Sequence, residues 1–92
     1  MSKKYEFQFS GNAEKNFASL ENDVKKRILK KLVYFEKVEE PLSFAKKLTG
    51  LEDNFSFRIG NYRVIVSPQD KKTLVILVIL KIGHRREVYN FN

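Results

Sequence analysis

Two arginines on either side of a predicted turn are the residues of this sequence best placed to bind an anion. Gly60-Asn61 is a two-residue hairpin signal, with glycine first as a type II′ turn prefers. If this pair closes a hairpin, Arg58 lies directly opposite Arg63, and two like charges across a strand pair cost roughly 0.2–1 kcal/mol. A phosphate between the two guanidinium groups would offset that cost, because arginine binds phosphate oxygens through paired hydrogen bonds. The alternative is a solvated sheet face on which the arginines point apart.

The C-terminal tail adds a second basic cluster with an aromatic side chain beside it. In an extended tail, one face carries Arg85, Glu87 and Tyr89, and the other carries His84, Arg86 and Val88. Arginine can hold the backbone of single-stranded RNA, while tyrosine stacks on an unpaired base or acts near a hydroxyl. The single histidine is by default an exposed turn residue, and general acid or base chemistry is its less favoured role. The tail therefore favours an RNA-binding face over a merely solvated one.

Other chemistries lack the residues that they need. With one histidine and no cysteine, the chain cannot build a zinc site or a disulfide scaffold, and its carboxylates show no paired ligand spacing. It has neither a glycine-rich phosphate loop nor a serine nucleophile motif. The formal net charge of +7 favours a polyanionic partner, although a well-solvated surface is the plain alternative.

The helices that must position these residues follow from hydrophobic spacing. Period-two alternation over 5–9 predicts a first strand with one buried face. Ser10 is then expected to cap a short helix, and Asn22 or Asp23 to cap a second, longer helix. The predicted core stripe of the second helix is Val24, Ile28, Leu32 and Phe35.

The second half of the chain is predicted to be mostly strands. Pro41 ends the helical region, and 42–53 is expected to be a loop that holds at most one helical turn. Strands are predicted at 55–59, 62–66 and 74–82, with a further short strand in the tail at 84–89. A turn is expected at 68–72. The run 74–82 is apolar on both faces, which indicates a central strand.

The predicted fold is α+β, in the order β-α-α-β-β-β(β), with two N-terminal helices packed on one face of an antiparallel sheet. Ninety-two residues suggest one domain over 1–92. The charged N-terminus has no apolar run behind it, so a signal peptide is not expected, and the apolar run at 73–80 is far short of the roughly 20 residues that span a bilayer. We therefore expect a cytoplasmic protein without a membrane partner.

Three short motifs make the sequence similar to a known family. They are Leu48-Thr-Gly-Leu51, Phe57-Arg-Ile-Gly-Asn-Tyr-Arg63 and Leu80-Lys-Ile-Gly-His-Arg-Arg-Glu-Val-Tyr89. In this order they resemble the RelE-type toxins of the RelE/ParE superfamily, found in bacterial and archaeal toxin–antitoxin pairs. The similarity covers nearly the whole chain in length and element order, and it implies a single RelE-like toxin domain.

The resemblance implies an enzyme that enters the ribosomal A site and cuts mRNA there without a metal or other cofactor, the message's own 2′-hydroxyl attacking the adjacent phosphate. It makes Arg63 and Arg85 phosphate clamps that stabilise the transition state, and Tyr89 a stacking residue or general base. Arg58 matches a basic position of the family, whereas Ser56 stands where some members carry lysine. Further substrate contacts are expected from Lys81, His84, Arg86, Lys46 and Lys47.

Such a reaction needs a base for the 2′-hydroxyl, stabilisation of charge on the phosphorane, and a proton for the leaving 5′-oxygen. Arginine meets the second need. It meets the first and third poorly, as does tyrosine, because both hold their protons tightly at neutral pH. A lowering of the tyrosine pKa by the arginine cluster is a hypothesis that would supply the base.

The same resemblance implies a RelB-like antitoxin as partner, with the ribosome and mRNA as targets and a toxin–antitoxin assembly as an expected form. Two alternatives stay open: a ParE-like inhibitor of DNA gyrase, and a non-catalytic module that binds RNA or DNA. The Arg-x-x-Val-Tyr ending favours the nuclease, because gyrase-directed relatives usually lack that tyrosine. For the remaining lysines a solvated basic surface is the first interpretation and binding of ribosomal RNA the second; they are Lys25, Lys26, Lys30 and Lys31, together with Lys46 and Lys47.

Overall fold

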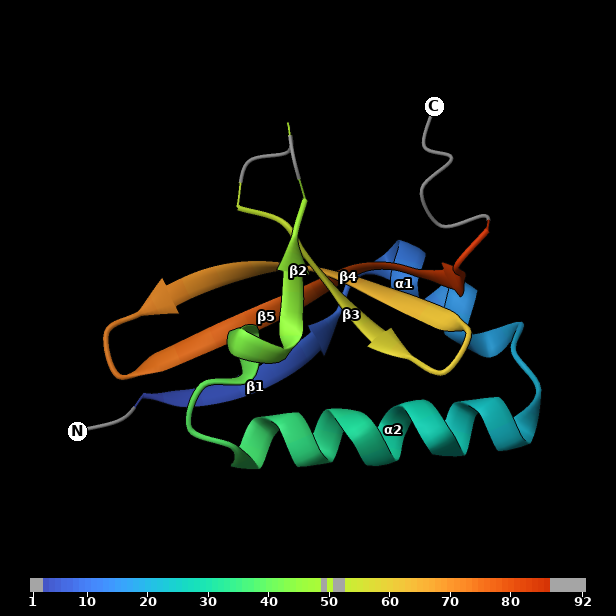
Figure 1. Ribbon diagram of the computed structural model, residues 1–92, viewed down its shortest axis with the longest axis horizontal. Coiled ribbons are helices and arrows are strands. Elements are labelled where there is room, and N and C mark those ends of the chain that lie inside the picture. The colour runs from blue at the N-terminus through green and yellow to red at the C-terminus, as the bar shows by residue number, and fades with distance from the viewer. Residues whose placement is uncertain (1–2, 49, 51–52, 87–92) are drawn as a thin grey trace.

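The computed structural model describes residues 3–48, 50 and 53–86, which form a five-stranded sheet with two helices (Figure 1). The helices are α1 (Gly11–Ala18) and α2 (Asn22–Lys37), followed by the 3-10 turn η1 (Pro41–Phe44). The strands are β1 (Lys4–Phe9), β2 (Ala45–Lys47), β3 (Phe55–Ile59), β4 (Tyr62–Lys71) and β5 (Leu74–His84). They lie in the order β1-β5-β4-β3-β2, so the first and last strands of the chain are neighbours. The predicted α+β fold with two N-terminal helices is confirmed.

The sheet is mixed, which corrects the expected antiparallel arrangement. β1 pairs with β5 in parallel, from Lys4 opposite Leu74 to Phe9 opposite Ile79, while the other three pairings are antiparallel. Parallel neighbours need a long crossover, and here both helices and three strands lie between β1 and β5 in the chain. The alternating pattern of β1 identifies a strand, but it contains nothing about the direction of the strand beside it.

Two local predictions in the second half of the chain are wrong. The segment 42–53, expected to be a loop with at most one helical turn, does contain most of the turn η1, but it also contains the edge strand β2, which is too short to show alternation. The turn expected at 68–72 comes later, because β4 continues to Lys71 and Lys72 takes the positive φ of 65° at the reversal. Pro68 is tolerated within β4 because β5 alone pairs with that part of the strand in the described chain, as suits a residue without an N–H.

α2 covers one face of the sheet and supplies much of the core against it (Figure 1). The predicted stripe is confirmed, since the four residues are all buried: Val24, Ile28, Leu32 and Phe35. The Phe35 ring packs on Phe57 of β3, with the ring centroids 4.6 Å apart. α1 lies beside the C-terminal half of β5, where Ala13 joins the same core.

The predicted N-cap residue is correct for α1 and wrong for α2. Ser10 caps α1 as predicted, because its hydroxyl accepts a hydrogen bond from the Ala13 N–H at 3.1 Å. α2 already begins at Asn22, after Glu21 in the N-cap position, and Glu21 makes no side-chain capping bond. The predicted cap at Asn22 or Asp23 is therefore wrong by one or two residues.

Candidate nucleic-acid interface

An extra residue in β5 decides which of its side chains lie on the face of the sheet opposite α2. The odd-numbered residues over 75–79 are buried on the α2 face. Uninterrupted alternation would put Lys81 on the same face as Ile79. The pairing with β4 instead shifts by one residue at this point, which makes Leu80 an extra residue, a β-bulge. Beyond the bulge Ile82 points inward and is 3% exposed, so Lys81 points outward.

The shifted register brings two rows of side chains together on this face. The first row crosses four strands and consists of Lys46, Ser56, Ile65 and Lys81. The second row consists of Arg58, Arg63 and Gly83. We call these seven residues, together with Arg85, the arginine face. The predicted pairing of Arg58 with Arg63 is confirmed, and Gly60 has the positive φ of 61° that suits glycine at the start of the turn.

Gly83 contributes no side chain to the arginine face, but its neighbours are basic. Lys81 precedes it and Arg85 follows it, each two residues away along the strand direction. The Arg85 N–H donates to the Asn61 carbonyl at 2.8 Å, which extends the β4–β5 ladder one residue past β5. Arg63 is the direct partner of Gly83 across that ladder. An anion bound over Gly83 is therefore bordered by Arg63, Lys81 and Arg85.

The two paired arginines differ in exposure. Arg58 is exposed, whereas Arg63 is half-buried, and its Nε is buried without a hydrogen-bond partner in the described part of the chain. A buried donor that lacks an acceptor costs about 1–3 kcal/mol. The acceptor for Arg63 must therefore come from a ligand or from residues outside the described ranges, and a phosphate oxygen is a suitable one.

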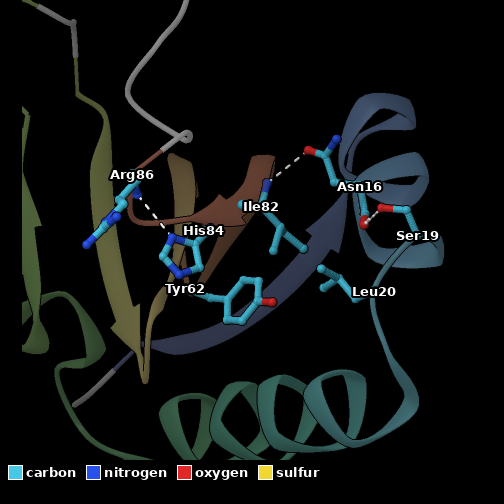
Figure 2. Close-up of a pocket in the computed structure, with 8 residues that line it drawn as sticks. Asn16, Ser19, Leu20, Tyr62, Ile82, His84 and Arg86 are labelled. Carbon is cyan, nitrogen blue, oxygen red and sulfur yellow. Dashed lines mark hydrogen bonds between the residues drawn. The ribbon is translucent and has the colours of Figure 1, made fainter.

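His84 lies on the other side of the sheet from the arginine face, and Arg86 follows in the turn after β5. Both line a hollow of about 500 Å³ between the end of the sheet and α1, which Tyr62 and Asn16 also line (Figure 2). The His84 ring meets Tyr62 edge to face at 5.7 Å between centroids, and the Arg86 N–H donates to His84 Nδ1 at 3.3 Å (Figure 2). Because His84 pairs with Tyr62, one position along from the pairing of Gly83 with Arg63, its side chain faces away from the arginine face.

The other residues predicted to contact substrate or RNA are not all found on the arginine face. Lys47 pairs with Phe55 and shares the α2 side of the sheet, so it is separated from its neighbour Lys46. The lysines of α2 belong to the helical layer on that side; they are Lys25, Lys26, Lys30 and Lys31. Tyr89 and the rest of the predicted tail strand beyond Arg86 lie outside the described residues, so the role of Tyr89 stays a prediction.

Two asparagines of α1, which the sequence interpretation missed, hold the bulged part of β5. β1 pairs with β5 only as far as Ile79. Beyond it, Asn12 Nδ2 donates to the Leu80 carbonyl at 2.9 Å, and Asn16 Oδ1 accepts the Ile82 N–H at 3.0 Å (Figure 2). The two asparagines are four residues apart and so lie on one face of the helix. Their i, i+4 spacing was the available signal, and it predicts a polar helix face against a strand edge.

Residues 3–48, 50 and 53–86 contain neither a metal-binding cluster nor a membrane-spanning helix. No three acidic or histidine side chains in these ranges come together to hold a metal ion. No helix among the described residues combines the length and the apolar character that crossing a bilayer requires. The basic side chains of the arginine face make it suited to a polyanion backbone.

Comparison with known families identifies the chain. The family model described as the ParE toxin of type II toxin–antitoxin systems, parDE, matches residues 7–89 and so includes the whole arginine face. The chain belongs to the ParE toxin family. It is therefore a toxin of a type II toxin–antitoxin system. Among curated proteins, none matches the sequence significantly.

Solved structures relate this ParE-family chain to RelE toxins. The RelBE2 toxin–antitoxin complex of Mycobacterium tuberculosis is 28% identical, with a TM-score of 0.74 over 89% of this chain and 99% of that chain. The archaeal RelE–RelB complex of Pyrococcus horikoshii is 27% identical, with a TM-score of 0.64 over 89% and 96%. The isolated E. coli RelE toxin is 25% identical, with a TM-score of 0.63 over 87% and 83%. The predicted membership of the RelE/ParE superfamily is confirmed.

Proposed function

We propose that this toxin is a ribosome-dependent endoribonuclease that cleaves mRNA in the A site without a metal. The observation that supports this proposal best is the arrangement around Gly83, where Arg63, Lys81 and Arg85 border one position on the sheet. Arg58 extends the basic surface across the hairpin. This arrangement suits the binding of two neighbouring phosphates in an extended RNA strand.

In the proposed reaction the 2′-hydroxyl of one nucleotide attacks the adjacent phosphorus. Arg63 and Arg85 bind the non-bridging oxygens and stabilise the additional negative charge that develops there. Arg58 and Lys46 bind the flanking backbone. Tyr89 stacks on a base of the message or takes the 2′-hydroxyl proton, and the ribosome holds the mRNA in the required conformation.

A RelB-like antitoxin is the proposed partner that restrains this activity. The similar structures from Mycobacterium tuberculosis and Pyrococcus horikoshii are complexes of a toxin with its antitoxin. An acidic segment of such an antitoxin would complement the net charge of +7. Action on translating ribosomes also implies a cytoplasmic location.

Purified toxin added to programmed ribosomes tests the proposal directly. Primer extension on the message is expected to reveal new 5′ ends within the A-site codon. Arg63→Ala and Arg85→Ala should each reduce single-turnover cleavage by about 100-fold or more, as loss of an oxyanion-binding donor does. Lys47→Ala is the matched control, because it removes a basic side chain from the opposite face of the sheet. An intact message with wild-type toxin would contradict the proposal.

Inhibition of DNA gyrase is the second candidate, and the match to the ParE family model favours it. It predicts that the toxin blocks supercoiling of a plasmid by purified gyrase while leaving ribosome-bound mRNA intact. A non-catalytic RNA-binding module would bind RNA with a salt slope that Arg63→Ala reduces, yet it would produce no cleaved ends. Cleaved message, blocked supercoiling, or RNA binding without either effect therefore distinguishes the three functions.

A further inference from the structure

We infer that Lys81 is the general acid that protonates the leaving 5′-oxygen, an inference that rests on the proposed mRNA cleavage. The arginines of the arginine face can bind the phosphate, but their guanidinium groups hold their protons too tightly to be good acids at neutral pH. A lysine ammonium group is a stronger acid than a guanidinium and transfers its proton readily to an alkoxide. Among the described residues of the arginine face, lysines at 46 and 81 have this chemistry.

Lys81 is the lysine nearer to the expected phosphate. It lies on β5 two residues from Gly83, and it is a diagonal neighbour of Arg63 across the β4–β5 ladder. Diagonal neighbours in antiparallel strands are about 7–8 Å apart at Cα, within reach of a lysine and an arginine that bind one ligand. Lys46 lies three strands away from β5 on the edge strand, and it is exposed, whereas Lys81 is half-buried.

The bulge is what makes this placement possible. In an uninterrupted β5, Lys81 would share the core face with Ile79, which is fully buried. The extra residue at Leu80 turns Lys81 to the arginine face. The Leu80 carbonyl is in turn held by Asn12 of α1, so the strand is fixed directly beside the proposed acid.

The step that we assign to Lys81 accounts for each bond formed or broken and for each proton transferred. The 2′-oxygen forms a bond to phosphorus and loses its proton to water or to a base of the toxin. The bond between phosphorus and the 5′-oxygen breaks, and a proton moves from Lys81 Nζ to that oxygen. The products are a 2′,3′-cyclic phosphate and a 5′-hydroxyl, and solvent returns a proton to Lys81.

An mRNA with sulfur in place of the leaving 5′-oxygen distinguishes an acid from a residue that only binds. The cleavage position is first mapped with ordinary mRNA on ribosomes, and the sulfur is then placed at that linkage. Lys81→Met is expected to slow cleavage of the oxygen linkage by about 100-fold or more, yet to cleave the sulfur linkage within about threefold of wild type, because a thiolate leaves without a proton. Lys81→Arg keeps the charge and should remain slow on oxygen.

Matched variants separate this role from folding and from general electrostatics. Lys71→Met removes an exposed lysine of β4 that lies outside the arginine face, opposite Leu74, and should cleave both linkages within about threefold of wild type. Thermal melting checks that Lys81→Met is folded, and Lys81→Gln is the second variant if it is not. An equal loss on both linkages, or no loss on oxygen, would overturn the inference. If wild-type toxin leaves the ordinary message intact, the proposed function fails and the inference fails with it.

Discussion

The part of β5 before its bulge and the part after it differ in almost every contact. From Leu74 to Ile79 the strand is paired with β1 on one side and β4 on the other, and its inward side chains are at most 6% exposed. After Leu80, β1 has ended and side chains of α1 take its place along the strand edge. Ile82 continues the core, while Lys81, Gly83 and Arg85 line the arginine face.

This difference arises from one extra residue. Both parts of the strand alternate, and their side chains would continue on the same faces if the ladder were regular. The bulge reverses the faces between Ile79 and Lys81, so a strand that anchors the core also presents a basic site. Bulges often re-aim a side chain beside a functional site, and the bulge of β5 turns Lys81 toward the arginine face.

The largest expected effect comes from exchanging residue types across the bulge. Ile79→Lys would bury an unpaired ammonium in the core, which costs several kcal/mol and should prevent cooperative folding. Lys81→Ile should fold and cost far less, because its position faces away from α2. Urea unfolding followed by circular dichroism measures both. Equal destabilisation by the two changes would show that Lys81 shares the face of Ile79 and that the bulge is absent.

A second comparison lies within the bulged part itself. Ile82→Ala should destabilise the toxin by about 2–5 kcal/mol, because Ile82 is almost fully buried. Leu80→Ala removes a side chain that is only half-buried, so its cost should be less than half as large. The two variants are compared by denaturant midpoint. A larger loss for Leu80→Ala would mean that Leu80 takes the inward position.

The hydrogen bond from α1 to the bulged part can be removed by a side chain with the same number and branching of heavy atoms. Asn16→Leu leaves the Ile82 N–H without its acceptor and should cost about 1–3 kcal/mol. Asn12→Leu should cost less, because the Leu80 carbonyl also accepts from the Ser10 hydroxyl at 3.4 Å. Amide hydrogen exchange at Ile82 provides the local measurement. Unchanged protection in Asn16→Leu would mean that other groups hold this part of the strand.

The sequence predicted what depends on local pattern. It predicted both helices, the core stripe of α2 and the pairing of Arg58 with Arg63, because helical spacing and a two-residue turn determine these within a few residues. It missed the parallel pairing of β1, because direction depends on a partner far along the chain. It also missed the bulge, which appears only when β4 and β5 are set in register, although Lys81 in an apolar run was its one visible trace.

The smallest expected effect tests whether the arginine face is maintained at a cost to stability. Arg63→Thr relieves the repulsion with Arg58, which should stabilise the toxin by about 0.2–1 kcal/mol at low salt. Added salt should narrow the difference, since screening weakens the repulsion in the wild type. Thermal melts at two salt concentrations measure this, with Lys47→Thr as the control on the other face. A loss of stability would instead mean that Arg63 has a stabilising partner within the toxin, and the repulsion would no longer be a reason to expect an anion between the two arginines.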